Sequence, residues 1–201
     1  MDIIIATANS HKVFEIQKKF TSFSDIKFMP MSIIENLPEI EETGSTFSEN
    51  ALIKAEAIAA LTDSYVLSDD SGLEIDALNG EPGIFSARYG NLDTDEQRYN
   101  LVLSKMKDIP EDRRTARFIC SIAFIEPDGT IYTTEGRCEG YIALQPSGSN
   151  GFGYDPVFFV PEFSCTMAEI NIEEKNRISH RAKALENFYQ YINSKKMQDK
   201  L

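Results

Sequence analysis

Short apolar runs alternate with amphipathic helical patterns along this chain, and that alternation restricts the possible folds more than any other feature. Residues 3–5 are all isoleucine, which is typical of a short buried strand, and Val13, Ile16 and Phe20 follow at helical spacing. Between residues 118 and 124, Phe, Cys, Ile and Phe recur at every second position, as in a half-buried strand, and Cys120 is expected to be a small core residue. Thr94 and Gln97 are spaced as a capping box at the start of a further helix, and residues 194–201 are expected to be a frayed polar tail. Strands that interleave with helices in this way predict an α/β fold.

Length, charge and cysteine usage narrow the possible functions. The 201 residues can bury a sizeable core, and no linker or repeat divides them, so we expect a single domain over residues 1–201. The net charge of −12 argues against general binding to nucleic-acid backbones, but it permits a small anionic ligand in a locally cationic cleft. No apolar run approaches the roughly 18 residues of a membrane span. Three widely spaced cysteines form neither a disulfide framework nor a zinc motif, which fits the cytoplasm.

The first candidate for catalysis is the acidic pair Asp69 and Asp70, which follows a short apolar run at residues 65–67. Carboxylates there can hold Mg²⁺, which prefers oxygen ligands and often takes one or two protein carboxylates together with substrate phosphates. Because neighbouring residues of a strand point to opposite faces, only one of the pair is expected to face a shared site. The alternative interpretation is a turn whose Asp and Ser side chains bind the local backbone.

Two segments before this pair can supply further ligands. An acidic run at Glu39, Glu41 and Glu42 can complete a metal site with an aspartate, although such runs are also common in solvated loops. Residues 7–12 join the first predicted strand to the first predicted helix, where backbone N–H groups, hydroxyls and Lys12 can bind phosphate. Their spacing is not that of a P-loop.

A glycine-rich loop at residues 147–155 carries two aromatic residues, Phe152 and Tyr154. Aromatic rings in such a loop can stack on a nucleobase, which contributes about 1–3 kcal/mol per base. The alternative interpretation is a tight connection between two strands.

Cationic side chains gather near the last predicted helix, which we expect over about residues 180–192. Lys175, Arg177, His180 and Arg181 can donate to a purine carbonyl or a phosphate, or they can form the solvated start of that helix. The chain has only two histidines, which excludes a histidine-rich metal site, and it lacks the Gly-x-Ser-x-Gly elbow of many hydrolases. Chemistry by metal-activated water is therefore the best candidate.

Taken in their order along the chain, these segments resemble the inosine triphosphate pyrophosphatase family. The similarity extends from residue 3 to about residue 185, and its motifs are residues 7–12, 41–51, 68–73, 82–89, 151–156, 174–176 and 179–181. The Ser-Ala-Arg-Tyr form at residues 86–89 is similar to the bacterial branch, the dITP/XTP pyrophosphatases. Departures are small: His11 stands where many members have Gly, and Ser68 where many have Ala.

The resemblance implies Mg²⁺-dependent hydrolysis of ITP, dITP and XTP to the monophosphate and pyrophosphate, which removes deaminated purines from the nucleotide pool. It also implies an α/β fold with a long mixed, twisted β-sheet flanked by helices, two lobes with a central nucleotide-binding cleft, and a homodimer. Two alternatives stay open at this point: a pyrophosphatase for another modified nucleotide, and a nucleotide sensor that has lost turnover.

The resemblance also implies roles for individual residues. Asp70 is expected to be the general base and a metal ligand, Glu41 the second metal carboxylate, and Asp69 a supporting residue. His180 and Arg181 are expected to recognise the 6-oxo edge of the base. The expected substrate contacts are Thr7, Ala8, Asn9, Ser10, His11, Lys12, Ser71, Phe152, Gly153, Tyr154, Asp155, Lys175, His180 and Arg181.

Overall fold

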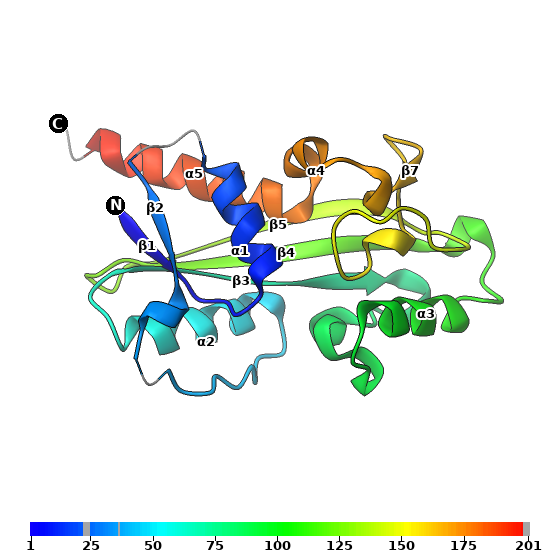
Figure 1. Ribbon diagram of the computed structural model, residues 1–201, viewed down its shortest axis with the longest axis horizontal. Helices are drawn as coiled ribbons and strands as arrows, with labels where there is room; N and C mark the ends of the chain where they lie inside the picture. Colours follow the sequence, from blue (N-terminus) through cyan, green and yellow to red (C-terminus); the bar gives the residue numbers. More distant parts are fainter. Residues whose placement is uncertain (22–24, 36, 199–201) are drawn as a thin grey trace. The chain divides into compact units, whose positions relative to one another are not determined.

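A mixed β-sheet is the main element of this protein, shown in Figure 1 as a computed structural model that describes residues 1–21, 25–35 and 37–198. Within these residues the sheet has seven strands in the order β2-β1-β3-β4-β5-β6-β7. Strand β1 pairs in parallel with β2 and β3, whereas β6 pairs antiparallel with β5 and β7. The predicted α/β class with a mixed sheet is confirmed.

The strands and helices have the following bounds. The strands are β1 Asp2–Ile5, β2 Lys27–Pro30, β3 Tyr65–Ile75, β4 Thr115–Ile125, β5 Ile131–Ile142, β6 Phe158–Val160 and β7 Cys165–Thr166. The α-helices are α1 Ser10–Lys19, α2 Phe47–Ala59, α3 Asp95–Lys105, α4 Ile172–Ile178 and α5 His180–Gln198. Short 3₁₀ helices include η1 Met31–Ile33, η3 Gly83–Asn91 and η5 Asp155–Val157. No helix in the described ranges is long and apolar enough to cross a membrane.

The chain divides into two compact units. The first comprises residues 1–70, 120–136 and 181–201, and the second comprises residues 71–119 and 137–180. Strands β3, β4 and β5 each contribute residues to both units. A nucleotide-binding cleft between two lobes stays a prediction.

In the first unit, α1 and α5 cover one face of the strands and α2 covers the other (Figure 1). The alternation of side chains along β1 and β3 explains this arrangement, because successive residues of a strand point to opposite faces. One core cluster includes Ile3, Ile5, Leu67, Cys120, Ile16 of α1 and Phe188 of α5. The opposite cluster includes Ile4, Val66, Ala123, and Ala51, Ala55 and Ile58 of α2. The expectation that Cys120 is a small core residue is confirmed, since the side chain is fully buried.

In the second unit, the later half of β3 and the earlier half of β4 lie in a core with α3 and β6. This cluster includes Leu73, Ile75, Val102, Met106, Phe118 and Phe158. The helix α3 begins with the predicted capping box, in which Thr94 and Gln97 satisfy each other's backbone N–H groups. This unit contains the glycine-rich loop and the lysine of helix α4.

Two elements extend farther than their sequence patterns indicate. Strand β3 continues through Ser68, Asp69 and Asp70 to Ile75, although the polar residues are typical of a turn. Ser68 donates a hydrogen bond to the Ala51 carbonyl, and both aspartates are paired, so burial of these polar groups is compensated. Helix α5 continues to Gln198, beyond the predicted end near residue 192 and into a segment expected to be a frayed tail.

Candidate active site

The acidic pair of β3 faces two different environments. Asp69 points to the side of α1 and α5, where it meets Lys12 and Arg181. Asp70 points to the side of α2, where it meets Lys54. The two side chains lie on opposite faces of one strand, as expected for neighbouring strand residues, and the prediction that only one of them faces a shared site stays a prediction.

Asp70 is held by two side chains of α2. Its Oδ1 lies 2.9 Å from Lys54 Nζ, and its Oδ2 lies 3.4 Å from Asn50 Nδ2. Asn50 and Lys54 are four residues apart, so they lie on one face of the helix. Lys54 Nζ also lies 2.9 Å from Glu42 Oε1. A lysine therefore links the β3 carboxylate to the acidic segment that precedes α2.

The pKa values of Asp70 and Lys54 are both shifted by burial and by neighbouring charges. Burial raises the pKa of the Asp70 carboxyl, and the nearby charges of Lys54 and Lys12 only partly offset that effect. Burial would lower the pKa of Lys54, but Asp70, Asp69 and Glu42 outweigh it and raise the pKa, so the ammonium stays charged. A base whose pKa moves toward the working pH is more effective in general base catalysis.

Asp69 lies deeper than Asp70 and is almost completely buried. Burial alone would raise its pKa, but the charges of Lys12, Arg181 and Lys54 outweigh that effect and hold the pKa well below its usual range. The carboxylate is therefore ionised throughout the physiological pH range. The thiol of Cys120, 3.7 Å away, has its pKa raised by burial and by the Asp69 charge, so it is a neutral donor to this carboxylate.

The acidic segment presents two glutamates differently. Glu41, the predicted second metal ligand, is exposed, whereas Glu42 is half-buried and paired with Lys54. The fully buried Asn50 fixes this segment, because its Oδ1 accepts a hydrogen bond of 2.8 Å from the Gly44 N–H. The structure thus brings Glu42 to Asp70 through Lys54, and the metal-binding role of Glu41 stays a prediction.

The predicted phosphate loop forms the start of α1. Asn9 caps the helix, with its Oδ1 accepting from the His11 N–H at 3.0 Å and the Lys12 N–H at 3.4 Å. The Thr7 hydroxyl accepts from the Asn9 N–H at 3.2 Å. Ala8, Asn9, Ser10 and His11 are exposed, and Lys12 is half-buried with its ammonium at Asp69. The loop therefore offers one anchored cation and an exposed polar turn.

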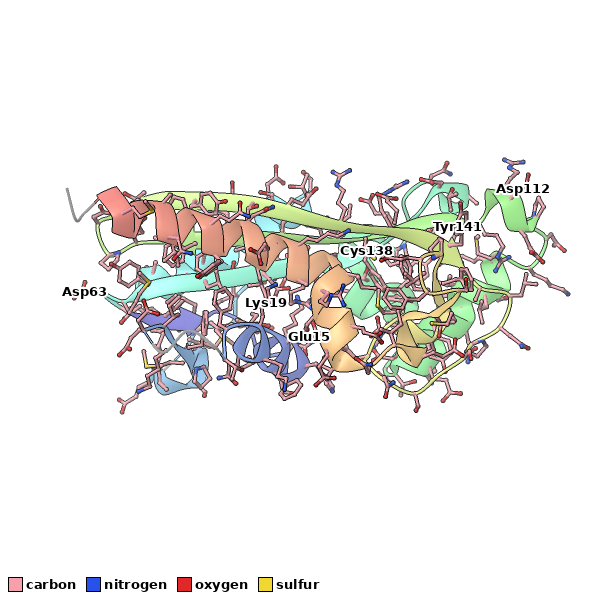
Figure 2. All side chains as sticks on the ribbon, turned by 90° about the horizontal axis from the view of Figure 1, so that it is seen from above. Glu15, Lys19, Asp63, Asp112, Cys138 and Tyr141 are labelled. Atoms are coloured by element: carbon pink, nitrogen blue, oxygen red, sulfur yellow. The ribbon has the colours of Figure 1, made fainter. Side chains whose placement is uncertain are left out.

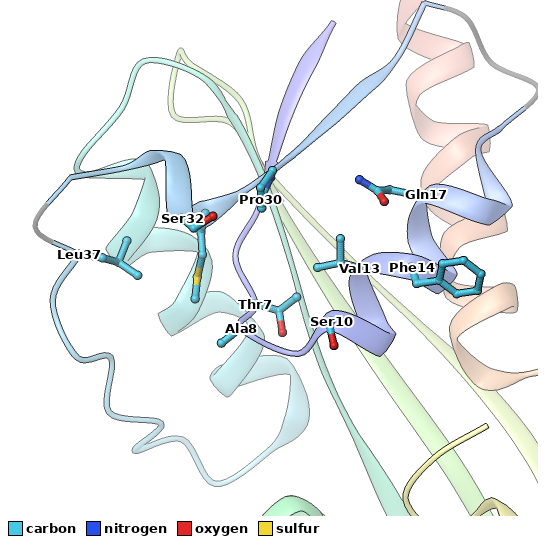
Figure 3. A pocket seen from close by; sticks show the side chains of 10 residues that line it. Thr7, Ala8, Ser10, Val13, Phe14, Gln17, Pro30, Ser32 and Leu37 are labelled. Carbon is cyan, nitrogen blue, oxygen red and sulfur yellow. The ribbon is translucent and has the colours of Figure 1, made fainter. Parts of the chain in front are cut away.

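A pocket of about 440 Å³ opens beside this loop (Figure 3). Its polar side is formed by Thr7, Ser10 and Ser32, and the remaining lining is largely apolar. Its complete lining is Thr7, Ala8, Ser10, Val13, Phe14, Gln17, Pro30, Met31, Ser32 and Leu37. Neither aspartate of β3 lines it, so the pocket adjoins the phosphate loop without containing the carboxylates.

In the second unit, the glycine-rich loop and α4 form a buried ion pair. Lys175 Nζ lies 2.6 Å from Asp155 Oδ2, and both side chains are almost fully buried. The same oxygen accepts a 2.9 Å hydrogen bond from the Phe152 N–H, and the lysine ammonium lies 4.9 Å from the centre of the Phe152 ring. Three of the predicted substrate contacts, Phe152, Asp155 and Lys175, are thus brought together.

Three other predicted contacts in this unit have structural partners. Tyr154 is buried in the core and its hydroxyl donates a 2.8 Å hydrogen bond to the Ser86 carbonyl, and stacking of its ring on a base stays a prediction. His180 is buried and stacks on Phe118, with ring centres 4.8 Å apart. The Gly153 N–H donates to Asp95 at 2.7 Å. Among the two aromatics of the loop, only Phe152 is partly exposed.

Gly151 leaves the space that the Asp155 carboxylate occupies, and Gly151→Ala is expected to lower nucleotide affinity. Its φ is +75°, and a Cβ there would lie 1.9 Å from Asp155 Oδ2 and 3.1 Å from Lys175 Nζ. We expect kcat/KM to fall by about tenfold or more, because the displaced carboxylate releases the lysine. Gly80→Ala is the matched control, since φ is +89° but nothing lies within 4 Å. An equal effect of both variants on kcat/KM would contradict this role.

A magnesium ion is implied by the family resemblance, and the residues present fit it in part. No group of three or more His, Cys, Asp or Glu side chains in the described ranges could hold a metal. Among the described residues, Asp70 accepts hydrogen bonds from Lys54 and from the more distant Asn50 amide. Because a carboxylate has about four acceptor positions, further positions remain for a metal ion. Mg²⁺ is often held by one or two carboxylates with substrate phosphates, so this donor set is compatible with the ion, and its binding here stays a prediction.

Comparison with known proteins assigns the chain to a family. The sequence model of the Ham1 family matches residues 3–191, which includes both aspartates and the segments predicted to bind phosphate and base. The chain belongs to the Ham1 family. This confirms the resemblance that its motifs indicate.

Relatives of this Ham1 family chain cover nearly its full length. It is 50% identical over 192 residues to a dITP/XTP pyrophosphatase of Halalkalibacterium halodurans, covering 94% of this chain and 97% of the relative. A dITP/XTP pyrophosphatase of Listeria monocytogenes is 48% identical over 91% of this chain and 90% of its own. The solved structure of a HAM1 protein from Coxiella burnetii is 44% identical, with a TM-score of 0.88, covering 96% of this chain and 99% of that chain.

Sequence reasoning missed two residues that hold Asp70, Asn50 and Lys54, and it named Glu42 only as one member of the acidic run. The relevant signal was present, since Asn50 and Lys54 are polar residues four apart on the same helix face as each other, within the alanine-rich part of α2. Their burial shows that they face the strand rather than solvent.

Proposed function

We propose that this chain is a nucleoside triphosphate pyrophosphatase that hydrolyses dITP, XTP and ITP to the monophosphate and pyrophosphate. The observation that carries the proposal is the full-length likeness to dITP/XTP pyrophosphatases, at 50% identity over 94% of the chain. The carboxylate needed for turnover is present at Asp70 and has charged partners, which favours an enzyme over a nucleotide sensor.

In this proposal Asp70 and a glutamate of the acidic segment, Glu41 or Glu42, hold Mg²⁺. When bound, Mg²⁺ neutralises triphosphate charge and helps to orient the phosphates. Asp70 accepts a proton from the attacking water, whose oxygen bonds to the α-phosphorus. The bond from that phosphorus to the bridging oxygen breaks, and pyrophosphate leaves.

The cations of the first unit stabilise the phosphates. Lys12 lies beside Asp69 and Lys54 beside Asp70, and their ammonium groups can donate to phosphate oxygens. Because phosphoryl transfer depends mainly on positioning and charge stabilisation, these two anchored cations supply much of what the reaction needs.

The pair Lys175 and Asp155, with the Phe152 ring, supplies recognition of the base. A lysine donor suits the 6-oxo group of a deaminated purine, whereas the 6-amino group of ATP would place donor against donor. A buried site that matches donors with acceptors can reject a mismatched analogue by about 10⁴-fold. Substrate choice would therefore depend on the second unit and hydrolysis on the first.

The test is a panel of nucleotides with pyrophosphate as the measured product, with and without Mg²⁺. We expect kcat/KM for dITP, XTP and ITP to exceed that for ATP by at least about a hundredfold, and product to require the metal. A higher kcat/KM for another modified nucleotide would replace the substrate assignment. Tight binding of nucleotide with Mg²⁺ but without pyrophosphate release would support a sensor.

We also propose a cytoplasmic homodimer. An enzyme that acts on the nucleotide pool must share a compartment with it. The 22.6 kDa chain should sediment at about twice its mass in dilute solution, and a monomer at all concentrations would exclude the dimer.

A further inference from the structure

The Asp69 carboxylate is the centre of a buried ion network in the first unit. Its Oδ2 lies 3.2 Å from Lys12 Nζ, 3.1 Å from Arg181 Nε and 3.0 Å from Arg181 Nη2. Its Oδ1 is buried and has no hydrogen-bond partner among the described residues. All of these contacts are therefore made by the Oδ2 atom, which binds both Lys12 and Arg181.

Arg181 extends this network back to the helix that carries Lys12. Its Nη1 forms an ion pair with Glu15 Oε2, and the guanidinium is 2% exposed. Glu15, labelled in Figure 2, is three residues after Lys12 on α1, so both side chains lie on one face of that helix. Two ion pairs therefore hold the first turns of α1 in place: Lys12 with Asp69, and Glu15 with Arg181.

The Lys12 ammonium keeps one N–H donor for a ligand. An ammonium has three N–H donors. Lys12 Nζ reaches Asp69 Oδ2 at 3.2 Å and the Asp69 carbonyl oxygen at 3.4 Å, which accounts for two donors within the described part of the chain. The side chain is 12% exposed, so the third donor can reach a phosphate oxygen. With two cations and two carboxylates, the network is neutral.

We propose that Asp69 is a positioning residue that directs the Lys12 ammonium toward the substrate's phosphates, with Arg181 and Glu15 holding Asp69 and α1 in place. This inference rests on the proposed function for the identity of the substrate. It assigns different tasks to the adjacent aspartates: Asp70 acts on the reacting water, and Asp69 acts only through Lys12. Anchoring at a fixed carboxylate lowers the entropy that a flexible lysine would lose on binding phosphate.

A double-mutant cycle of Asp69→Asn and Lys12→Met tests this assignment. Two readouts are used: kcat and KM for dITP, and binding of inorganic tripolyphosphate with Mg²⁺ by calorimetry. We expect each single variant to weaken tripolyphosphate binding and kcat/KM by about tenfold to a hundredfold, mainly through KM. We expect the double variant to be no weaker than Lys12→Met alone.

The comparison of Lys12→Met with the double variant remains available if Asp69→Asn alone does not fold. The double variant removes one cation and one carboxylate, so the remaining pair of Arg181 and Glu15 is neutral. A further loss of kcat in the double variant would overturn the proposal, since Asp69 would then act independently of Lys12. Unchanged binding in Asp69→Asn would overturn it as well.

A matched control and the binding readout separate this inference from the proposed function. Asp76→Asn breaks another aspartate–arginine pair, with Arg117 at 2.8 Å, and is expected to leave both readouts unchanged. If the wild-type protein does not hydrolyse dITP, the substrate assignment fails. The coupling of Asp69 to Lys12 in tripolyphosphate binding would still support or contradict the positioning role.

Discussion

Replacement of Asp70 by asparagine is expected to abolish pyrophosphate release from dITP, with a loss of at least about 10³-fold in kcat, while the protein stays folded. The amide has the same shape but cannot accept the proton or carry the charge that faces Lys54. Lys54 keeps Glu42 as a partner, so no buried cation is left uncompensated. Steady-state kinetics and thermal melting measure the two effects.

Asp63→Asn is a suitable control because Asp63 is exposed just before the start of the same strand (Figure 2). Normal hydrolysis by Asp70→Asn would remove this residue from the mechanism.

Glu41→Gln and Glu42→Gln identify the second metal carboxylate, since the variant that needs more Mg²⁺ for half-maximal rate marks the ligand. The structure favours an additional effect of Glu42→Gln through Lys54, whereas exposed Glu41 should act only on the metal.

Replacement of Arg181 by methionine is expected to destabilise the protein by about 3–5 kcal/mol at neutral pH, because Asp69 and Glu15 lose their shared buried partner. In the wild type the pKa of Asp69 is lowered, so its contribution to stability is present above its unfolded pKa and is lost as pH falls. In the variant that carboxylate keeps Lys12 but loses the guanidinium, so its pKa is lowered less and it binds a proton more readily. The difference in unfolding free energy between the wild type and Arg181→Met should therefore become smaller below about pH 5.

Denaturant unfolding at several pH values measures this difference, and nucleotide kinetics on the folded fraction give a second comparison. The family resemblance implies that Arg181 recognises the base, which predicts a larger loss with ITP than with ATP. The buried contacts with Asp69 and Glu15 instead predict similar losses with both nucleotides. A stability difference that does not change with pH would contradict the role of the ion network.

The sequence predicted the elements whose signal is local. The apolar run of β1, the helical spacing in α1, the alternation in β4 and the capping box of α3 were all sufficient, because each depends on neighbouring residues. The limits of β3 and α5 were not predicted. Their polar residues are stabilised by partners distant in the chain, such as Asp69 with Arg181, and local patterns cannot identify such partners.

The sequence by itself determined the family and the α/β class, because these follow from ordered motifs and from the alternation of strand and helix patterns. It also predicted that Asp69 and Asp70 lie on opposite faces of one strand, because side chains alternate along a strand. Only the tertiary structure decided what each charged group faces. It brought Lys54 and Glu42 to Asp70, enclosed Arg181 between Asp69 and Glu15, and placed Tyr154 in the core. The physical reason is that a charge is stabilised inside a protein only by partners close in space, and those partners come from separate elements of the chain.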